Sequence, residues 1–508
     1  METATQELHR LTSYSPGREW DEPPDDPRAR HDFQSNDYAT LPLFYKRYAP
    51  GLPRLALPRE LPATTAPALA VLAGTAVLDG TEPAAPVPAE SARTPEDGLD
   101  LPALARLLYW SAGIVRTSPR ATYTHLFRAA GSAGGRFPLE AYVAVPAGYP
   151  SLPEGVHWYD PLEHALVTVG PAPGAGAPTI IVTGIPWRTG WRYGERGYRH
   201  VYWDAGTMLA QTLALADSAG IGAWLYTWFP DALVAGLVGA DQVHEWPVVL
   251  VTLGPGEPAI VGSGPAEPGE TDAKPLEFPL VTAAQRAGDG AVLGGPWNLA
   301  SAAPAAAGPA FPAGSAVAGM AAGPTVEAVI AARGSQRRMS PHRGLPLQTL
   351  HACMSVALRG IDVPHWVAVH DVTGLAPGLY RWPDLATPVR EGNLRDELHR
   401  VALDQGLARD AAFVAIAATD VSRLSDREYR EAQLAAGIVE GRLHLAAYAL
   451  GACATGMTFL DSEIPALLGS REFPDGLIFT CVGVPDYTSK QAGPPGAPTS
   501  VRRVAGRD

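Results

Sequence analysis

The chain has 508 residues, with 39 lysines and arginines against 52 aspartates and glutamates, a formal net charge of −13 when histidine is counted as neutral. This length is enough for two or three domains with a large buried core. The acidic balance, without a lysine-rich run or a basic stripe, argues against a nucleic-acid partner. The sequence also lacks a basic amphipathic segment and any uninterrupted apolar run of about 18 residues, which argues against a membrane partner.

The cysteines and the N-terminus bear on the cellular compartment. Cys353, Cys453 and Cys481 are far apart and form no Cys-x-x-Cys pair. This spacing argues against a disulfide framework and against a zinc site, so we expect no metal. The opening residues METATQELHR lack the charged-then-apolar order of a signal peptide. We therefore expect a cytoplasmic protein.

Two proline-rich stretches divide the chain, one at about 63–94 and one at about 257–324. Both are rich in Ala, Gly and Pro with weak periodicity, which is typical of linkers and long surface loops. We therefore expect an N-terminal arm with a Pro-rich segment (1–95), a first block (96–256), a linker (257–324), a second block (325–495) and a tail (496–508).

The two blocks end alike, which indicates an internal repeat. Each contains a helix of small and apolar residues, 204–220 in the first block and 435–451 in the second, closed by glycine. Each helix is followed by a β-rich run, then by Leu-Val-Gly or Leu-Leu-Gly, then by a final strand. Since helices this apolar belong in a core, the repeat predicts an α+β fold of two halves packed as an intrachain pseudo-dimer. The alternative is two unrelated alanine-rich helices.

The helix of the first block is expected to begin near Asp204, a plausible N-cap. The second block opens on a different pattern, Arg333-Gly-Ser335-Gln-Arg337. Because the three polar residues alternate, an extended backbone would point them the same way. Two guanidinium groups and a hydroxyl make a phosphate cradle, to which Lys490, beyond the last strand, could add a cation. The alternative is a solvated surface cluster.

These motifs resemble those of the nitroreductase superfamily. Arg-x-Ser-x-Arg is similar to its FMN-phosphate motif, Gly451–Met457 to its Gly-rich turn under the isoalloxazine ring, and Val482–Pro485 to its last strand. The resemblance implies two nitroreductase-like halves with antiparallel or mixed sheets around central core helices, and FMN as the cofactor. It also implies that the phosphate is held by Arg333, Ser335, Arg337 and Lys490, and that the backbone near Thr455 and Gly456 faces the flavin.

The segment Arg128–Val143 resembles Arg-x-x-Pro-Ser-Ala-Gly-x-x-Tyr/Phe-Pro-x-Glu of the SagB-type dehydrogenases, a nitroreductase branch that acts on ribosomal peptides. In the superfamily this loop of one subunit contacts the flavin held by the other, and its small residues allow close approach to a planar ring. We therefore expect Ser132 and Gly134 to contact a flavin held by the second block, although Gly131 replaces the usual proline. Each block lacks a clear copy of the other's motif, which implies one flavin site.

A third segment, Trp187–Gly206, resembles the Lys-Tyr-Gly-x-Arg-x-Tyr-Arg segment of azoline dehydrogenases, in which Lys and Tyr are the catalytic pair. Here the pair is Arg192-Tyr193. Arginine is effectively never deprotonated, so Arg192 would orient the substrate or stabilise negative charge. Tyr193 could serve as the acid or base if a neighbouring cation lowers its pKa. The alternative is a cationic, aromatic surface or a clamp of the pseudo-dimer.

The resemblance implies an FMN-dependent dehydrogenase that oxidises peptide thiazolines and oxazolines to thiazoles and oxazoles in ribosomal peptide biosynthesis. The implied partners are a peptide substrate with a leader and a cyclodehydratase, and a homodimer is compatible with it. Two alternatives are an NAD(P)H-dependent flavin reductase of nitro or quinone compounds, and a non-catalytic flavin-binding scaffold subunit. The replacement of Lys by Arg192 and of Pro by Gly131 motivates the scaffold alternative.

Overall fold

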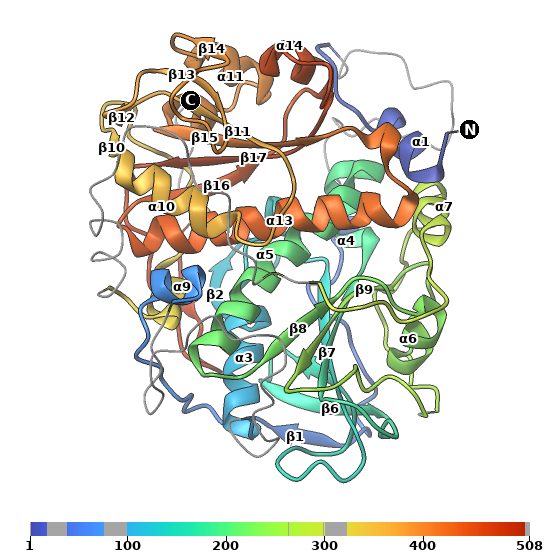
Figure 1. The fold of residues 1–508 in the computed structure, drawn as a ribbon. Coiled ribbons are helices and arrows are strands. Elements are labelled where there is room, and N and C mark those ends of the chain that lie inside the picture. The colour runs from blue at the N-terminus through green and yellow to red at the C-terminus, as the bar shows by residue number, and fades with distance from the viewer. Residues whose placement is uncertain are drawn as a thin grey trace.

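Two long buried helices form the centre of the protein, α5 (Gly197–Ser218) and α13 (Asp426–Ala449). The computed structural model describes residues 2–17, 38–75, 99–262, 264–297, 299 and 323–502. The two helices pack against each other, with one antiparallel sheet on either side of the pair (Figure 1). Shorter helices accompany them: α3 (Leu101–Ala112) packs on α5, and α10 (Leu347–Ala357) packs on α13.

The two sheets have the same strand order at their cores. The first sheet runs in the order β1 (Arg54–Ala56), β6 (Ala165–Gly170), β5 (Gly155–Asp160), β4 (Leu139–Val145), β7 (Thr179–Gly184), β9 (Trp246–Leu253), β8 (Ala223–Tyr226). The second runs in the order β14 (Arg390–Glu391), β13 (Gly378–Arg381), β11 (His365–Val369), β15 (Phe413–Thr419), β17 (Asp475–Gly483), β16 (Cys453–Met457). All neighbouring strands are antiparallel, and each sheet ends on the strand that follows its central helix. The predicted α+β fold, with two similar halves and antiparallel sheets around central core helices, is confirmed.

The remaining elements connect or cover these layers. The helices are α1 (Ala4–Leu11), α2 (Ala68–Ala73), α4 (Pro186–Tyr193), α6 (Asp231–Val238), α7 (Pro279–Ala287), α9 (Val326–Ala332), α11 (Arg395–Val401), α12 (Gly406–Asp410) and α14 (Ile464–Leu468). The 3-10 turns are η2 (Tyr38–Thr40), η3 (Ala133–Gly135), η4 (Gly194–Arg196), η5 (Val421–Arg423) and η6 (Asp461–Glu463). Two small sheets contain β18 (Thr499–Ser500), β2 (Ile114–Pro119) and β3 (Thr124–Arg128), and β10 (Leu345–Pro346) with β12 (Val372–Thr373).

The described parts of the arm and the linker contribute elements to the two halves. From residues 1–95, β1 pairs with β6 at the edge of the first sheet, and α2 packs on both central helices. From residues 257–324, α7 packs on α1. Within the described ranges, no helix is long and apolar enough to cross a membrane.

The central helices end as the repeat predicts. Gly220 and Gly451 follow α5 and α13 with φ of 69° and 75°, a left-handed conformation in which a side chain would be strained. The N–H of Ile221 donates to Ala216 O, and the N–H of Ala452 donates to Ala447 O, so the same backbone bonds close both helices. Gly239 and Gly469, which follow α6 and α14, also have left-handed φ values, of 67° and 62°.

The predicted start of α5 is wrong. The helix begins at Gly197, so Asp204 lies about two turns inside it and is not an N-cap. The segment before Asp204 is rich in arginine and aromatic residues. Such a composition indicates an exposed loop, because the sequence alone does not show the second half that buries these side chains. In the fold Arg196 and Arg199 are buried against the second half, and these contacts favour the helical conformation.

Two ion-pair clusters join the halves in a pseudo-symmetric way. At the start of α5, Arg196 and Arg199 each place Nη1 2.6 Å from the carboxylate of Asp461, which follows β16. At the start of α13, Arg427 and Arg430 bind Asp231, which follows β8, at 2.6 and 3.2 Å. Each central helix therefore holds the other half by two arginines one turn apart. This is the clamp considered as the alternative for the Arg-rich segment.

Candidate functional site

The loop of small residues between β3 and β4 is fastened at both ends. Arg128, at the end of β3, donates to Ala112 O at 3.0 Å, and its Nη2 lies 3.8 Å from the buried carboxylate of Glu140 in β4. Within the loop, Ser132 Oγ accepts from Phe137 N at 2.8 Å. The Arg and Glu of the sequence motif thus hold the two strands from which the loop projects.

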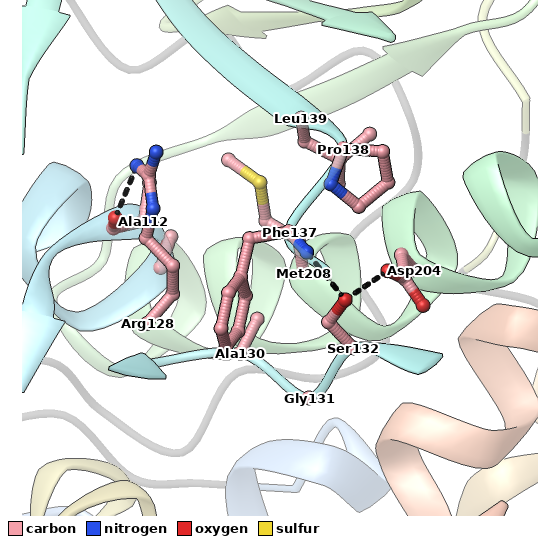
Figure 2. A pocket seen from close by; sticks show the side chains of 11 residues that line it. Ala112, Arg128, Ala130, Gly131, Ser132, Phe137, Pro138, Leu139, Asp204 and Met208 are labelled. Atoms are coloured by element: carbon pink, nitrogen blue, oxygen red, sulfur yellow. Dashed lines mark hydrogen bonds between the residues drawn. The ribbon is translucent and has the colours of Figure 1, made fainter. Parts of the chain in front are cut away.

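Asp204 on α5 is the anchor of this loop, as Figure 2 shows. Its carboxylate accepts from Ser132 Oγ at 2.5 Å and from Ala133 N at 2.9 Å. Burial raises the pKa of Asp204 to about 8, against the opposing effect of these hydrogen bonds, and the charge of Glu440 raises it further. No sequence motif indicates this role, because the aspartate is distant from the loop along the chain.

The first end of the loop meets the second half. A Cβ on Gly131 would lie 3.4 Å from Arg333 Nη1 and 3.8 Å from Ser335 Oγ. Arg333 also donates through Nη2 to Ala129 O. The structure therefore brings the loop that carries Ser132 and Gly134 against the start of the Arg-x-Ser-x-Arg motif, although the two lie in different halves.

Arg333 has the character of an anion-binding residue. Its side chain is buried, with a residue exposure of 3%, and its Nε and Nη1 have no hydrogen-bond partner among the described residues. Burial and the nearby charge of Arg116 lower its pKa to about 10. Because a buried cation with unpaired donors is costly, this position favours a bound anion.

The other phosphate-cradle candidates are more open. Ser335, Arg337 and Lys490 are exposed, whereas Arg333 is buried, so the alternating residues do not share one environment. Lys490 Nζ donates to Ser500 O at 3.4 Å, and its backbone oxygen accepts from Arg116 Nε at 2.7 Å. Ser335 Oγ lies near Gly131 beside Arg333, whereas among the described residues no contact places the side chains of Arg337 and Lys490 next to Arg333.

The second end of the loop meets the candidate catalytic pair. A Cβ on Gly134 would lie 2.6 Å from Tyr193 Oη, so only glycine allows this approach. Tyr193 is the last residue of α4, and its ring packs edge-on against His200 with centroids 4.1 Å apart. Arg192 beside it is exposed.

The expected lowering of the Tyr193 pKa is not observed. Burial raises the pKa of Tyr193 above its ordinary value, and the cations Arg192 and Arg136 offset this only in part. Tyr193 is therefore a neutral phenol at neutral pH. In this state its hydroxyl is a hydrogen-bond donor and a proton source.

The strand that carries Thr455 and Gly456 adds an acid that sequence reasoning missed. The carboxylate of Glu440 on α13 lies against Gly456 and takes the space that a Cβ at position 456 would need. The same carboxylate lies 3.7 Å from His444 Nε2, one turn further along the helix. The sequence feature that could have indicated Glu440 is its position as a single glutamate within a run of small and apolar residues, because glutamate is rarely buried unless it has a partner.

A pocket of about 270 Å³, including its open mouth, lies on the first-half side of the loop (Figure 2). Ser132 and Asp204 supply polar groups, while Phe137 and Met208 supply apolar walls. Arg333, Tyr193 and Gly456 lie outside its lining. Within the described residues, no group of three or more His, Cys, Asp or Glu side chains is placed to hold a metal ion.

The residues at the interface fit FMN. The unpaired donors of the buried Arg333 suit a phosphate, with Ser335 beside them. At Gly134 and Gly456 the space of a side chain is taken by Tyr193 Oη and by the carboxylate of Glu440, so the fit rests on Arg333 and Ser335 of the second half, next to Gly131 of the first.

The fold consists of two similar α+β halves, and a loop of the first half contacts Arg333 of the second. Residues 159–255 match the model of the Nitroreductase family. A curated relative, "Putative nitroreductase MJ1384" of Methanocaldococcus jannaschii, is 29% identical over 143 residues, which are 25% of this chain and 70% of the relative. Residues 159–255 therefore resemble the Nitroreductase family in sequence.

The likeness extends over the whole fold in a solved structure. The crystal structure of a "putative nitroreductase from anabaena variabilis" superposes with a TM-score of 0.65, covering 96% of this chain and 100% of that chain at 20% sequence identity. At this identity the match shows a shared fold. The second half, which the family model does not reach, thus has the nitroreductase-like fold as well.

Proposed function

We propose that this protein is an FMN-dependent dehydrogenase that oxidises peptide thiazolines and oxazolines to thiazoles and oxazoles. The observation that carries the proposal is the position of the 131–135 loop. Its first glycine meets Arg333 of the second half, and Gly134 meets Tyr193. One loop thus links the candidate phosphate group to the candidate catalytic residue, in the order that the SagB-type resemblance implies.

In the proposed reaction the chain binds the cofactor and places the substrate ring. Arg333, Ser335, Arg337 and Lys490 would hold the phosphate, while Ser132, Gly134, Thr455 and Gly456 would face the ring. When bound, FMN would supply the two-electron acceptor for the hydride from the azoline Cβ, with dioxygen as the terminal oxidant. The Cα proton leaves toward the protein, so the ring loses two hydrogens in total.

Tyr193 would carry the proton step. Because its pKa is raised, the phenol must pass its own proton to solvent water, which can reach this half-buried residue, as it receives the proton from Cα. The positive charges of Arg192 and Arg136 stabilise the phenolate character that develops during this relay. Arg192, which is exposed, would also orient the peptide.

We expect one flavin in each chain. When the sequence of α5 is aligned with that of α13, Trp224 and Leu225 of the first half correspond to Thr455 and Gly456 of the second half. There Trp297 N donates to Leu225 O at 2.7 Å, and Gly294 N donates to Trp228 O at 2.9 Å. The backbone of Gly294 and Trp297 therefore covers the edge of the chain at and after β8, at the position equivalent to the strand that is proposed to face the flavin in the second half.

The proposal includes partners. A SagB-type dehydrogenase implies a peptide substrate with a leader and a cyclodehydratase that forms the azoline. Co-purification with a cyclodehydratase encoded nearby would support this part of the proposal independently of the chemistry.

The test combines cofactor content with one substitution. We expect the purified chain to bind about one FMN, measured by visible absorbance and by the mass of the released chromophore. Tyr193→Phe should keep FMN and lose at least about a hundredfold of azoline oxidation, the range of a general acid or base. No FMN uptake, even from excess FMN, would contradict the oxidoreductase function. Full turnover by Tyr193→Phe would exclude the role of Tyr193, and reduction of nitro or quinone compounds without azoline oxidation would favour a flavin reductase.

A further inference from the structure

Arg136 is a buried cation beside the candidate catalytic residue, and it stands at a variable position of the Arg128–Val143 motif. The residue has an exposure of 8%. Its Nε donates to Gly134 O at 3.2 Å, within the loop that touches Tyr193. Among the described residues, no carboxylate lies within ion-pair distance of its guanidinium group. Within the part of the chain that the structure describes, the charge of Arg136 is therefore uncompensated.

Aromatic rings frame this guanidinium group. Its central carbon lies 4.9 Å from the centre of the Trp191 ring and 5.7 Å from that of Phe44. Tyr38 packs edge-on against Trp191, and Tyr123 stacks near Phe44, with centroids 5.6 and 6.1 Å apart. The frame opens to solvent, since Tyr38 is 64% exposed. It consists of residues from the N-terminal arm, the β2–β3 turn and α4.

The neighbouring titratable groups do not neutralise Arg136. Burial lowers the pKa of His125 to about 4, helped by Arg136 and Arg120, so this imidazole is neutral near pH 7. Tyr193 is neutral as well, and Arg192 adds a further positive charge. Cation–π contacts offset part of the cost of burying the guanidinium group, but they leave its charge in place.

From this geometry we infer that Arg136 binds a carboxylate of the substrate, in a subsite bounded by Phe44 and Trp191 and next to Tyr193. A guanidinium fork pairs with a carboxylate through two parallel hydrogen bonds, and the flanking rings favour a planar group. The subsite lies at the Tyr193 end of the loop, away from Arg333. The inference rests on the proposed function in that it assigns this end of the site to the substrate.

The test uses benzoate and benzamide, which have the same planar shape and differ in charge. Binding of each to the full-length chain is measured by calorimetry, and FMN content is measured separately from visible absorbance. We expect benzoate to bind about tenfold more tightly than benzamide, the contribution of a charge-assisted hydrogen bond. Arg136→Gln should remove this preference, whereas Arg136→Lys should retain part of it.

Arg120→Gln is the matched control, since it removes the same charge from a residue that also acts on His125 but lies outside the aromatic frame. It should keep the preference for benzoate. Equal affinities for the two compounds, a preference that survives Arg136→Gln, or an equal loss in Arg120→Gln would each overturn the inference. A chain that binds no FMN but prefers benzoate through Arg136 would contradict the proposed function and leave the carboxylate subsite supported.

Discussion

Gly206 of α5 and Gly437 of α13 lie against each other at the centre of the molecule. A Cβ on Gly437 would lie 2.5 Å from Trp203 O, and a Cβ on Gly206 would collide with the backbone of Gly437 and Ile438. The sequence repeat equates these two glycines with each other. The same displacement relates Tyr198 to Tyr429, whose rings are stacked with centroids 6.4 Å apart. The pseudo-symmetry of the halves is thus expressed as contact between equivalent residues.

The helix crossing should be intolerant of a single methyl group. We expect Gly206→Ala and Gly437→Ala each to lower the free energy of unfolding by about 1–3 kcal/mol or more, because backbone rather than a flexible side chain occupies the space. Urea unfolding of the purified variants measures this effect. The control is Gly236→Ala in the exposed face of α6, where nothing lies within 4 Å of the new Cβ. At this position the change from Gly to Ala should raise the free energy of unfolding by about 0.5–1 kcal/mol. Equal effects at the three positions would contradict the close crossing.

The ion pairs of Asp461 with Arg196 and Arg199 should make the stability of the contact between the halves decrease at acid pH. Burial raises the pKa of Asp461, but Arg196 and Arg199 outweigh it and hold the pKa far below its usual range. Stability from this group is therefore present above about pH 4 and is lost as the pH falls below that value. Asp461→Asn should cost about 3–5 kcal/mol at pH 7, since it leaves two buried arginines unpaired. Denaturant unfolding at pH 7 and pH 3 should show a smaller loss at the lower pH. Asp362→Asn, at an exposed position, should change stability little at either pH.

Local patterns predicted the parts of the fold that depend on neighbouring residues. The glycines after α5 and α13, the order of helix, strand, short helix and strand, and the apolar helix faces all follow from short-range chemistry. The start of α5 could not be predicted, because Arg196 and Arg199 are stabilised by Asp461 from the other half. The role of Asp204 was missed for the same reason, since its partners Ser132 and Ala133 are distant along the chain.

The site shows the same division. The resemblance of motifs proposed Arg333, Ser335 and Gly134, and the structure brings their loops together. The catalytic and cofactor-binding roles of these residues stay predictions. Electrostatic features were not accessible to sequence reasoning, because the raised pKa of Tyr193 and the uncompensated charge of Arg136 both depend on burial by several separate segments.

Asp204 should give the stability of the protein a distinctive pH dependence. Its pKa is about 8 in the fold, against an ordinary value of 3.8, so the folded state binds the proton more tightly than the unfolded state. Its contribution to stability is therefore complete below about pH 4 and declines as the pH rises toward 8. In Asp204→Asn this decline should be absent, so that the variant gains on the parent protein as the pH is raised from 5 to 8. Thermal unfolding at both pH values measures the difference. Parallel profiles for the two proteins would contradict a neutral Asp204, and Asp362→Asn, which is exposed, should leave the profile of the parent unchanged.

Arg333 should act in opposite directions on the flavin-free and the flavin-bound protein. Its Nε and Nη1 have no partner among the described residues, so Arg333→Gln removes a buried charge that is not compensated without an anion. We expect the variant to match or exceed the parent in flavin-free stability, measured by urea unfolding. Its affinity for FMN should fall by about tenfold to a hundredfold, as expected for lost charge-assisted hydrogen bonds, in a titration that follows the quenching of FMN fluorescence. Arg343→Gln, at an exposed position in the same segment, should change neither quantity. A structural arginine would behave in the opposite way, since its removal would destabilise the flavin-free chain and leave the intrinsic affinity for FMN intact.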